Sequence, residues 1–211
     1  MNREDNAMKH VWRAGAFVLF AFGAVVVADA GRCVSAQVAG DTAAVRAGPA
    51  GQRDGSRDFD FEIGTWRTEL RLLADPLTGS SRWLEYEGTS VVSEVLGGKA
   101  NLVELDVEGE AGRIQGLSLR LYEPASRQWT LNFANVGTGL LSPPVVGAFT
   151  DGRGEFYGMD RVNGRTILVR FIISDITPTS ARFEQAFSED GGQTWEVNWI
   201  AIDTRIPDDT R

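Results

Sequence analysis

Histidine and cysteine are nearly absent from this chain of 211 residues, and both lie close to its start. The single His is His10 and the single Cys is Cys33. Beyond residue 36 this excludes Ser-His-Asp and Cys-His nucleophiles, disulfide bonds, the usual zinc sites and a proximal His for haem iron. Chemistry there depends on carboxylates, Tyr, Arg, hydroxyls and one lysine, Lys99. We therefore expect no metal and no cofactor.

Only one long apolar run occurs, the 15 residues from Ala14 to Ala28. It is shorter than the roughly 20 residues of a membrane-spanning helix. Lys9 and Arg13 precede the run, and small residues follow it up to Ala36. This layout predicts a secretory signal peptide over residues 1–36, cleaved near Ala36, and hence a periplasmic or secreted protein. The alternative is a membrane anchor that stays uncleaved.

No cluster of Lys or Arg is present, and acidic residues outnumber basic ones. Removing residues 1–36 takes away four basic and three acidic residues and changes the formal net charge from −8 to −9. Nucleic acids and anionic membranes attract basic surfaces, so the charge excludes both as expected partners. Membrane contact is expected only through an uncleaved signal segment.

The character of the sequence changes near residue 58. Residues 37–57 are rich in Ala, Gly, Asp and Arg and lack aromatics, which predicts a disordered linker. Residues 58–206 carry short apolar runs separated by turn residues, which predicts an all-β domain, with a tail at 207–211. One helical turn is expected near residues 59–64. We expect ten strands, over residues 65–73, 83–93, 100–107, 114–122, 129–135, 145–150, 155–161, 165–174, 181–188 and 195–204.

Short turns between these strands favour an antiparallel up-and-down arrangement. A sheet of about ten such strands can close into a barrel, which leaves no free edge. A barrel of eight to ten strands is either filled by side chains or holds one small ligand. The fold predicted is a single antiparallel up-and-down β-barrel, and the alternative is a two-sheet sandwich.

The stretch FDFEIGTW, residues 59–66, resembles the start of calycin barrels, the superfamily of lipocalins, fatty-acid-binding proteins and nitrobindins. There a helical turn precedes a G-x-W motif. The resemblance implies that Trp66 is a core residue and that Arg205, after the last strand, packs over it and closes one end of the barrel. This chain departs from nitrobindins by lacking a His for iron, and from lipocalins by lacking disulfide cysteines.

A second resemblance lies in RFEQAFSEDGGQTWEVNWI, together with SPPVVGAF upstream. These stretches are similar to an uncharacterised bacterial family of lipocalin-like barrels, many of them behind signal peptides. The resemblance implies a fold and no particular activity.

Polar residues that share a strand face with apolar ones are candidates for the wall of a lumen. Arg170 lies between Leu168 and Ile172, and a charge in so apolar a strand needs a partner. Glu184 is the expected partner, in a pair on the surface or in the cavity. The candidate ligand-binding residues are Glu87, Asn101, Arg120, Tyr157, Arg170, Glu184 and Asn198.

Residues 188–195, SEDGGQTW, fit the Asp-box pattern S-x-D-x-G-x-T-W of sialidase propellers. One copy in so short a chain cannot supply the blades of a propeller, which take roughly 40 to 50 residues each. We therefore interpret the box as a structural hairpin. Ser188 and Asp190 are expected to accept backbone N–H groups of the turn, and Trp195 to fold over it.

Three functions are compatible with the sequence. The first is a barrel that binds a small, mainly apolar molecule in its lumen without catalysis. The second is a carboxylate-dependent lyase, isomerase or hydrolase with two carboxylates facing across the lumen, one of raised pKa. The third is a filled barrel that binds a protein partner. For the second, the candidate carboxylates are Glu85, Glu87, Glu184 and Glu196.

Overall fold

The computed structural model describes residues 54–207. The predicted signal peptide, most of the predicted linker and nearly all of the predicted tail lie outside this range. Within it, no helix is both long and apolar enough to pass through a membrane.

Ten long stretches of the described chain form strands, close to the ranges expected from the sequence, and one further strand is only two residues long. Two turns of 3-10 helix, η2 and η3, precede them. The elements are η2 (Gly55–Arg57), η3 (Asp60–Glu62), β1 (Gly64–Leu73), β2 (Trp83–Val95), β3 (Ala100–Gly109), β4 (Gly112–Glu123), β5 (Gln128–Asn135), β6 (Leu140–Leu141), β7 (Val145–Thr150), β8 (Arg153–Val162), β9 (Arg165–Ser174), β10 (Ser180–Ser188) and β11 (Glu196–Arg205).

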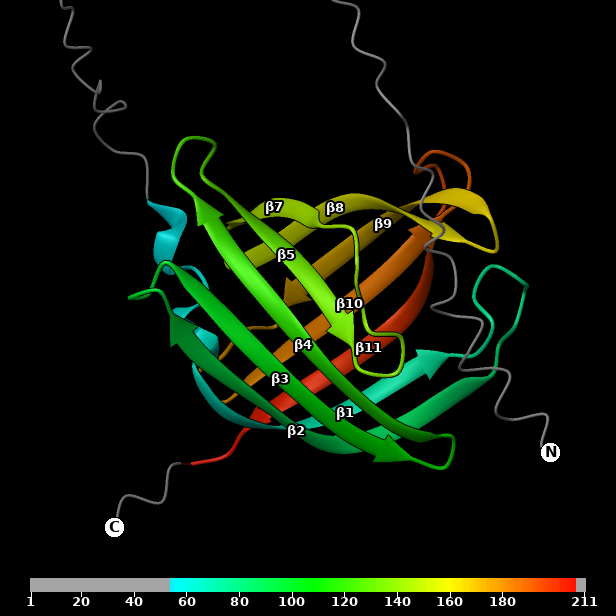
Figure 1. Cartoon of the computed structure of the whole chain (residues 1–211), viewed down its shortest axis with the longest axis horizontal. Coiled ribbons are helices and arrows are strands. Elements are labelled where there is room, and N and C mark those ends of the chain that lie inside the picture. Colours follow the sequence, from blue (N-terminus) through cyan, green and yellow to red (C-terminus); the bar gives the residue numbers. More distant parts are fainter. Residues whose placement is uncertain (1–53, 208–211) are drawn as a thin grey trace, which may run out of the picture. The chain divides into compact units, whose positions relative to one another are not determined.

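The strands form one closed antiparallel barrel (Figure 1). From β7 to β11, and from β1 to β5, each strand pairs with the next along the chain. β5 pairs with β7 at residues 129–131, and β1 pairs with β11 over residues 66–72. These last two pairings join the halves and close the ring, so the predicted up-and-down barrel is confirmed and the sandwich is excluded.

The short β6 is the one strand that the sequence did not predict. Leu140 and Leu141 pair with Asn135 and Ala134 at the end of β5, beyond the part of β5 that pairs with β7. Two residues are too few to show an alternating pattern, because period-2 alternation needs at least four positions.

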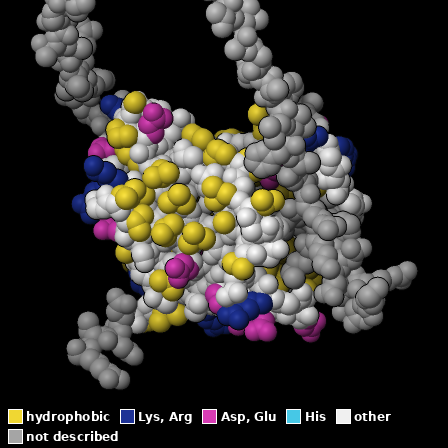
Figure 2. Space-filling view, viewed as in Figure 1, with side chains coloured by type: hydrophobic (Ala, Val, Ile, Leu, Met, Phe, Trp, Pro, Cys, Tyr) yellow, Lys and Arg dark blue, Asp and Glu magenta, His cyan; other side chains and the backbone are white. Residues whose placement is uncertain are grey.

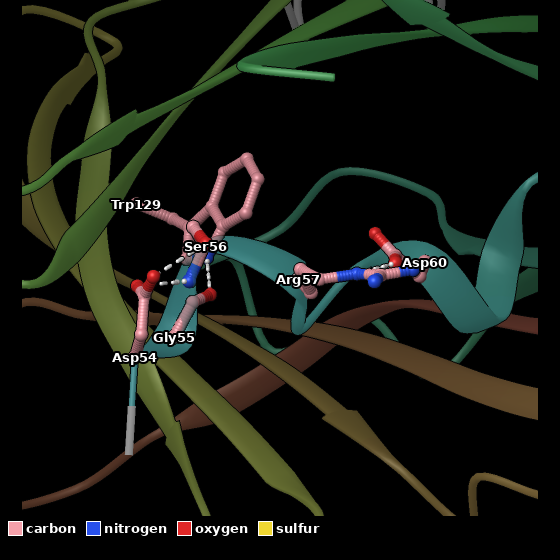
Figure 3. Close-up of polar contacts among 6 residues, drawn as sticks. All are labelled: Asp54, Gly55, Ser56, Arg57, Asp60 and Trp129. Carbon is pink, nitrogen blue, oxygen red and sulfur yellow. Dashed lines mark hydrogen bonds and ion pairs between the residues drawn. The ribbon is translucent and has the colours of Figure 1, made fainter. Parts of the chain in front are cut away.

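The first described residues belong to the barrel. Asp54 accepts a hydrogen bond from Ser56 N–H at 3.0 Å and so caps η2. The buried indole of Trp129 donates from Nε1 to the Gly55 carbonyl at 2.9 Å, and Arg57 forms an ion pair with Asp60 (Figure 3). The predicted linker over residues 37–57 therefore extends too far, since Asp54–Arg57 are held against β5.

One end of the barrel is closed by the contact expected between Arg205 and Trp66. Trp66 is fully buried, and its Nε1 donates to the Glu62 carbonyl at 2.6 Å. Arg205 Cζ lies 4.1 Å from the centre of the Trp66 ring. Arg205 also donates to the carbonyls of Ile63, at 2.8 Å, and Phe61. One guanidinium thus joins the last strand to the residues around η3.

Apolar side chains also gather on the outside, over β3, β4 and β5 (Figure 2). Leu117, Leu121 and Leu141 are exposed there. The outward positions of β4 include two leucines that alternate with inward Ser118 and Arg120. Because this strand is as apolar outside as inside, hydropathy alone does not identify its inner face.

The Asp-box forms the hairpin between β10 and β11. Asp190 accepts hydrogen bonds from Thr194 N–H at 2.9 Å, Thr194 Oγ1 at 2.6 Å and Ser188 Oγ at 2.8 Å. Gly192 N–H donates to Ser188 Oγ at 2.8 Å, and Trp195 Nε1 donates to the Gly192 carbonyl at 3.1 Å. The turn is therefore held by the side chains of the motif, led by Asp190.

We expect Asp190→Ala to lower the melting temperature and to speed hydrogen exchange at the Thr194 amide, since three hydrogen bonds are lost. Thr194 and Ser188 hold the pKa of Asp190 well below its usual range. The stabilisation is therefore present above the ordinary aspartate pKa and is lost as pH falls through the lowered value. Thermal unfolding at neutral and acidic pH measures both effects, and Asp190→Asn is the matched variant. Equal melting of Asp190→Ala and wild type at neutral pH would contradict this role.

Candidate ligand-binding cavity

The interior of the barrel holds a cavity of about 170 Å³ that is partly open to solvent. Apolar side chains from strands on all sides contribute to its wall, among them Leu72, Leu105, Phe171, Phe183 and Trp199. A cavity of roughly 150 Å³ with an apolar lining holds benzene in another protein. The space is therefore sufficient for a ring-sized organic molecule, and the lumen is not completely filled by side chains.

A buried ion pair forms part of the wall. Glu62, from η3, and Arg120, from β4, are 1% and 4% exposed. Both terminal nitrogens of Arg120 donate to the two carboxylate oxygens of Glu62, with Nη2 to Oε1 at 3.1 Å. Arg120 Cζ also lies 4.3 Å from the centre of the Phe59 ring. The two terminal nitrogens are thus engaged with one carboxylate and the guanidinium lies over one aromatic face, while its Nε–H has no acceptor among the described residues.

Asp203 is a second buried carboxyl group in the same wall. It lies on β11 opposite Thr68 of β1 and is 4% exposed. The pKa of Asp203 is raised to about 7, mainly by burial and also by the charge of Glu62, while the Thr68 hydrogen bond and the charge of Arg120 oppose the rise. This group therefore changes its charge near neutral pH.

Two hydroxyl groups lie beside this carboxyl. Thr68 Oγ1 and Ser90 Oγ are 2.7 Å apart and share a hydrogen bond, and both residues line the cavity. Asp203 Oδ1 has no hydrogen-bond partner among the described residues. Unpartnered buried oxygens are rare in folded proteins, which makes Asp203, a lining residue, a candidate contact for a ligand.

A separate set of polar groups from β5, β10 and β11 also lines the cavity. Gln185 Nε2 donates to Asn198 Oδ1 at 2.9 Å, and Asn132 Nδ2 donates to the Ser142 carbonyl at 3.0 Å. Asn198 and Asp203 are five positions apart, or roughly 16 Å in an extended strand. The cavity thus has a charged region near η3 and an amide-rich region at a different depth.

Two of the sequence-predicted residues, Arg120 and Asn198, line this cavity. Asn101 is buried and pairs with Arg120 across β3 and β4, but it is not part of the wall. Glu87 points outward: its side chain is 73% exposed and forms an ion pair with Arg67 at 3.2 Å. The inward face of β2 carries Tyr86, Ser90 and Val92 instead, so the placement of Glu87 in the wall was wrong.

The remaining three predicted residues, Tyr157, Arg170 and Glu184, lie outside the cavity wall. Arg170 Cζ stacks 4.7 Å over the Trp195 ring, and Tyr157 packs against the same indole. Glu184 pairs with Arg182 at 2.8 Å. The predicted pair of Arg170 with Glu184 was wrong, because the register of β9 and β10 sets Arg170 opposite Ala186 and offers it an aromatic face.

Sequence reasoning missed Glu62, Thr68, Ser90 and Asp203. A signal for two of them was present in the contact between Trp66 and Arg205. Residues two positions apart on a strand share a face, so an inward Trp66 places Thr68 inside and an inward Arg205 places Asp203 inside. Glu62 lies within the FDFEIGTW stretch that predicts the helical turn.

None of the four carboxylates considered for catalysis lines the cavity; these are Glu85, Glu87, Glu184 and Glu196. Across residues 54–207, no group of three or more His, Cys, Asp or Glu side chains is placed to hold a metal ion.

The comparison with solved structures found similar barrels. The S-type phycobiliprotein lyase CPES from Guillardia theta aligns with a TM-score of 0.52 and 12% identity, over 74% of this chain and 94% of that chain. A second, EF1p2_mFAP2b bound to DFHBI, aligns with a TM-score of 0.40 and 10% identity, over 72% and 99%. At this identity the first similarity concerns the fold alone. The shared fold is a closed antiparallel β-barrel.

No protein-family model matches the sequence. The search of curated proteins also found no match.

Proposed function

We propose that this barrel binds a small, mainly apolar molecule in its lumen without transforming it. The observation that carries the proposal is the cavity of about 170 Å³, whose apolar wall includes a few buried polar groups. Ligand sites commonly combine an apolar lining with a small number of polar groups that orient the ligand. The open space also counts against a filled barrel that serves only as a protein-binding module.

Absence of catalysis is part of the proposal. A pair of working carboxylates needs both groups free to exchange protons or attack. Glu62 is bound by two nitrogens of Arg120, which leaves Asp203 as the carboxyl beside it that has no ion-pair partner. An enzyme remains the second candidate because the pKa of Asp203, about 7, suits a general acid or base. The barrel fold is compatible with both functions.

The cellular setting is proposed from the sequence. The apolar run and cleavage pattern of residues 1–36 support a signal peptide and a periplasmic or secreted location. The stretches SPPVVGAF and RFEQAFSEDGGQTWEVNWI support membership in an uncharacterised bacterial family of lipocalin-like barrels, many of them behind signal peptides. The expected partner is a small apolar molecule, and neither nucleic acid nor a membrane surface is proposed.

A variant that blocks the lumen tests the proposal. Ala201 lines the cavity on β11, whereas its neighbour Ile202 is exposed outside. We expect single-ring and two-ring apolar molecules to raise the melting temperature of the wild type and of Ile202→Phe, but not of Ala201→Phe.

Ser118→Leu, on the opposite side of the lumen, replaces Ala201→Phe if that variant does not fold. Native mass spectrometry of each complex gives the stoichiometry, expected to be one molecule per barrel. The proposal fails if no molecule of the panel shifts the wild type, or if the lumen-blocking variants are shifted equally.

A further inference from the structure

The charged region of the lumen contains one cation and two carboxyl groups. Arg120, Glu62 and Asp203 are all less than 5% exposed. The single positive charge is matched to Glu62 through two hydrogen bonds. When Asp203 ionises, a negative charge remains without a cation of its own, which is costly in an apolar interior.

No other cation of the described chain is available to Asp203. Arg205 lies two positions farther along β11, but its nitrogens donate to the carbonyls of Phe61, Ile63 and Pro178. The groups that face Asp203 are the Thr68 hydroxyl from β1, Glu62 from η3 and Arg120 from β4. Asp203 Oδ1 stays without a partner among them. The wall therefore holds one unmatched acidic oxygen.

We propose that the lumen selects molecules in which a mainly apolar body carries a protonated nitrogen, and that Asp203 holds this cationic group. The inference rests on the proposed function and names the class of ligand. A ligand cation would bring the charge of the region to zero: Arg120 and the ligand would balance Glu62 and Asp203. It would also supply the missing donor to Oδ1, and charge-assisted hydrogen bonds are the stronger kind.

An anionic ligand fits this region poorly. It would face two carboxyl groups, and the terminal nitrogens of Arg120 are already used by Glu62. Drawing Arg120 away would leave Glu62 as a buried charge without a partner. A neutral ligand with a hydroxyl group could satisfy Oδ1, but it would leave the charge of Asp203 uncompensated.

The protonation of Asp203 makes a preference for cationic ligands measurable. Burial raises the pKa of Asp203 to about 7, so the carboxyl of the empty barrel is largely protonated at acidic pH. A ligand cation favours the ionised form, and its binding at acidic pH must release a proton. Affinity for a cation should therefore rise by close to tenfold for each pH unit below about 7, and level off above it.

Three single-ring probes of similar size separate the possibilities: benzylamine as a cation, benzyl alcohol as a neutral molecule and benzoate as an anion. Isothermal titration calorimetry at about pH 5, 6, 7 and 8 measures each affinity, and buffers of different ionisation enthalpy count the protons released. We expect benzylamine to bind most tightly at pH 8 and to show the rise with pH. The affinity for benzyl alcohol should change little with pH, and benzoate should bind more weakly than either of the other two probes.

The matched variants are Asp203→Asn and Asp160→Asn. Asp160 is the other cavity-lining aspartate, and burial also raises its pKa. We expect Asp203→Asn to weaken the binding of benzylamine by at least about tenfold at pH 8 and to abolish the proton release on binding. The affinity for benzyl alcohol should stay unchanged. Asp160→Asn should retain the preference for benzylamine.

The inference is overturned if benzyl alcohol or benzoate binds wild type as tightly as benzylamine at pH 8. Loss of benzylamine in Asp160→Asn, with Asp203→Asn unaffected, would overturn the assignment to Asp203. In these outcomes a probe still occupies the lumen, so the proposed function stands. If none of the three probes binds, the failure is that of the proposed function itself.

Discussion

Asp203→Asn is expected to make the protein more stable than the wild type at pH 8, although it changes a single buried oxygen to nitrogen. The pKa of Asp203 is raised from 3.8 to about 7 in the folded chain. Between these values the folded state binds more protons than the unfolded state, so the free energy of unfolding falls as pH rises. At about 1.4 kcal/mol per pKa unit, the full loss above pH 7 is about 4 kcal/mol.

The variant carries no ionisable group at this position and should not lose this stability. Denaturant unfolding at about pH 4, 5, 6, 7 and 8 measures the difference between the two proteins. We expect the difference to be small at pH 4 and to grow up to pH 7 to 8. Asp106→Asn is the matched control: Arg113 lowers the pKa of the exposed Asp106, so this change should act in the opposite direction. A difference that does not vary with pH would show that Asp203 ionises normally.

Arg120→Met should cost about 3 to 5 kcal/mol of unfolding free energy, because it leaves Glu62 as a buried charge without its cation. The variant also loses the stacking of the guanidinium on Phe59. Replacing both partners, in Glu62→Leu with Arg120→Met, should recover most of the loss, since an apolar pair of similar volume needs no charge compensation. Denaturant unfolding at neutral pH gives the unfolding free energies of the wild type, Arg120→Met and the double variant.

Arg113→Met is the control for this series. Arg113 lies on the same strand, but its side chain is 56% exposed where it pairs with Asp106. Exposed ion pairs contribute about 0 to 1 kcal/mol, so this variant should stay close to wild type. If Arg120→Met costs no more than Arg113→Met, the buried pair does not stabilise the barrel.

The strands were predictable because their turn residues and apolar runs are local signals. Which face of each strand points into the barrel was harder to predict from the sequence, and the reason differs from strand to strand. Glu87 was predicted to line the lumen, whereas Tyr86 and Ser90 occupy the inward positions of β2, and Trp83, although aromatic, shares the face of Glu87. On β4, exposed leucines alternate with inward polar residues. In both strands apolar character does not distinguish inside from outside.

Asn198 shows a second reason why the inward face of a strand is hard to predict from alternation. The register between β10 and β11 shifts at residues 185 and 186, so Trp199 pairs with Gln185 while Val197 pairs with Ala186. Asn198 is the extra residue of this β-bulge, and a bulge breaks the alternation of faces. Arg205 and Asp203 lie beyond the shift and keep their common face. The position of one fixed inward residue therefore predicts its neighbours only up to the next bulge.

The pairing of β1 with β11 determines when the barrel can close during synthesis of the chain. β11, with Arg205 near its end, is the last of the described strands to be synthesised, whereas Trp66 is made almost 140 positions earlier. Contacts so distant in sequence form slowly, and none of them can form before the ribosome has released β11. The ring of described strands therefore stays open until β11 has been made. Until then the cavity has no complete wall.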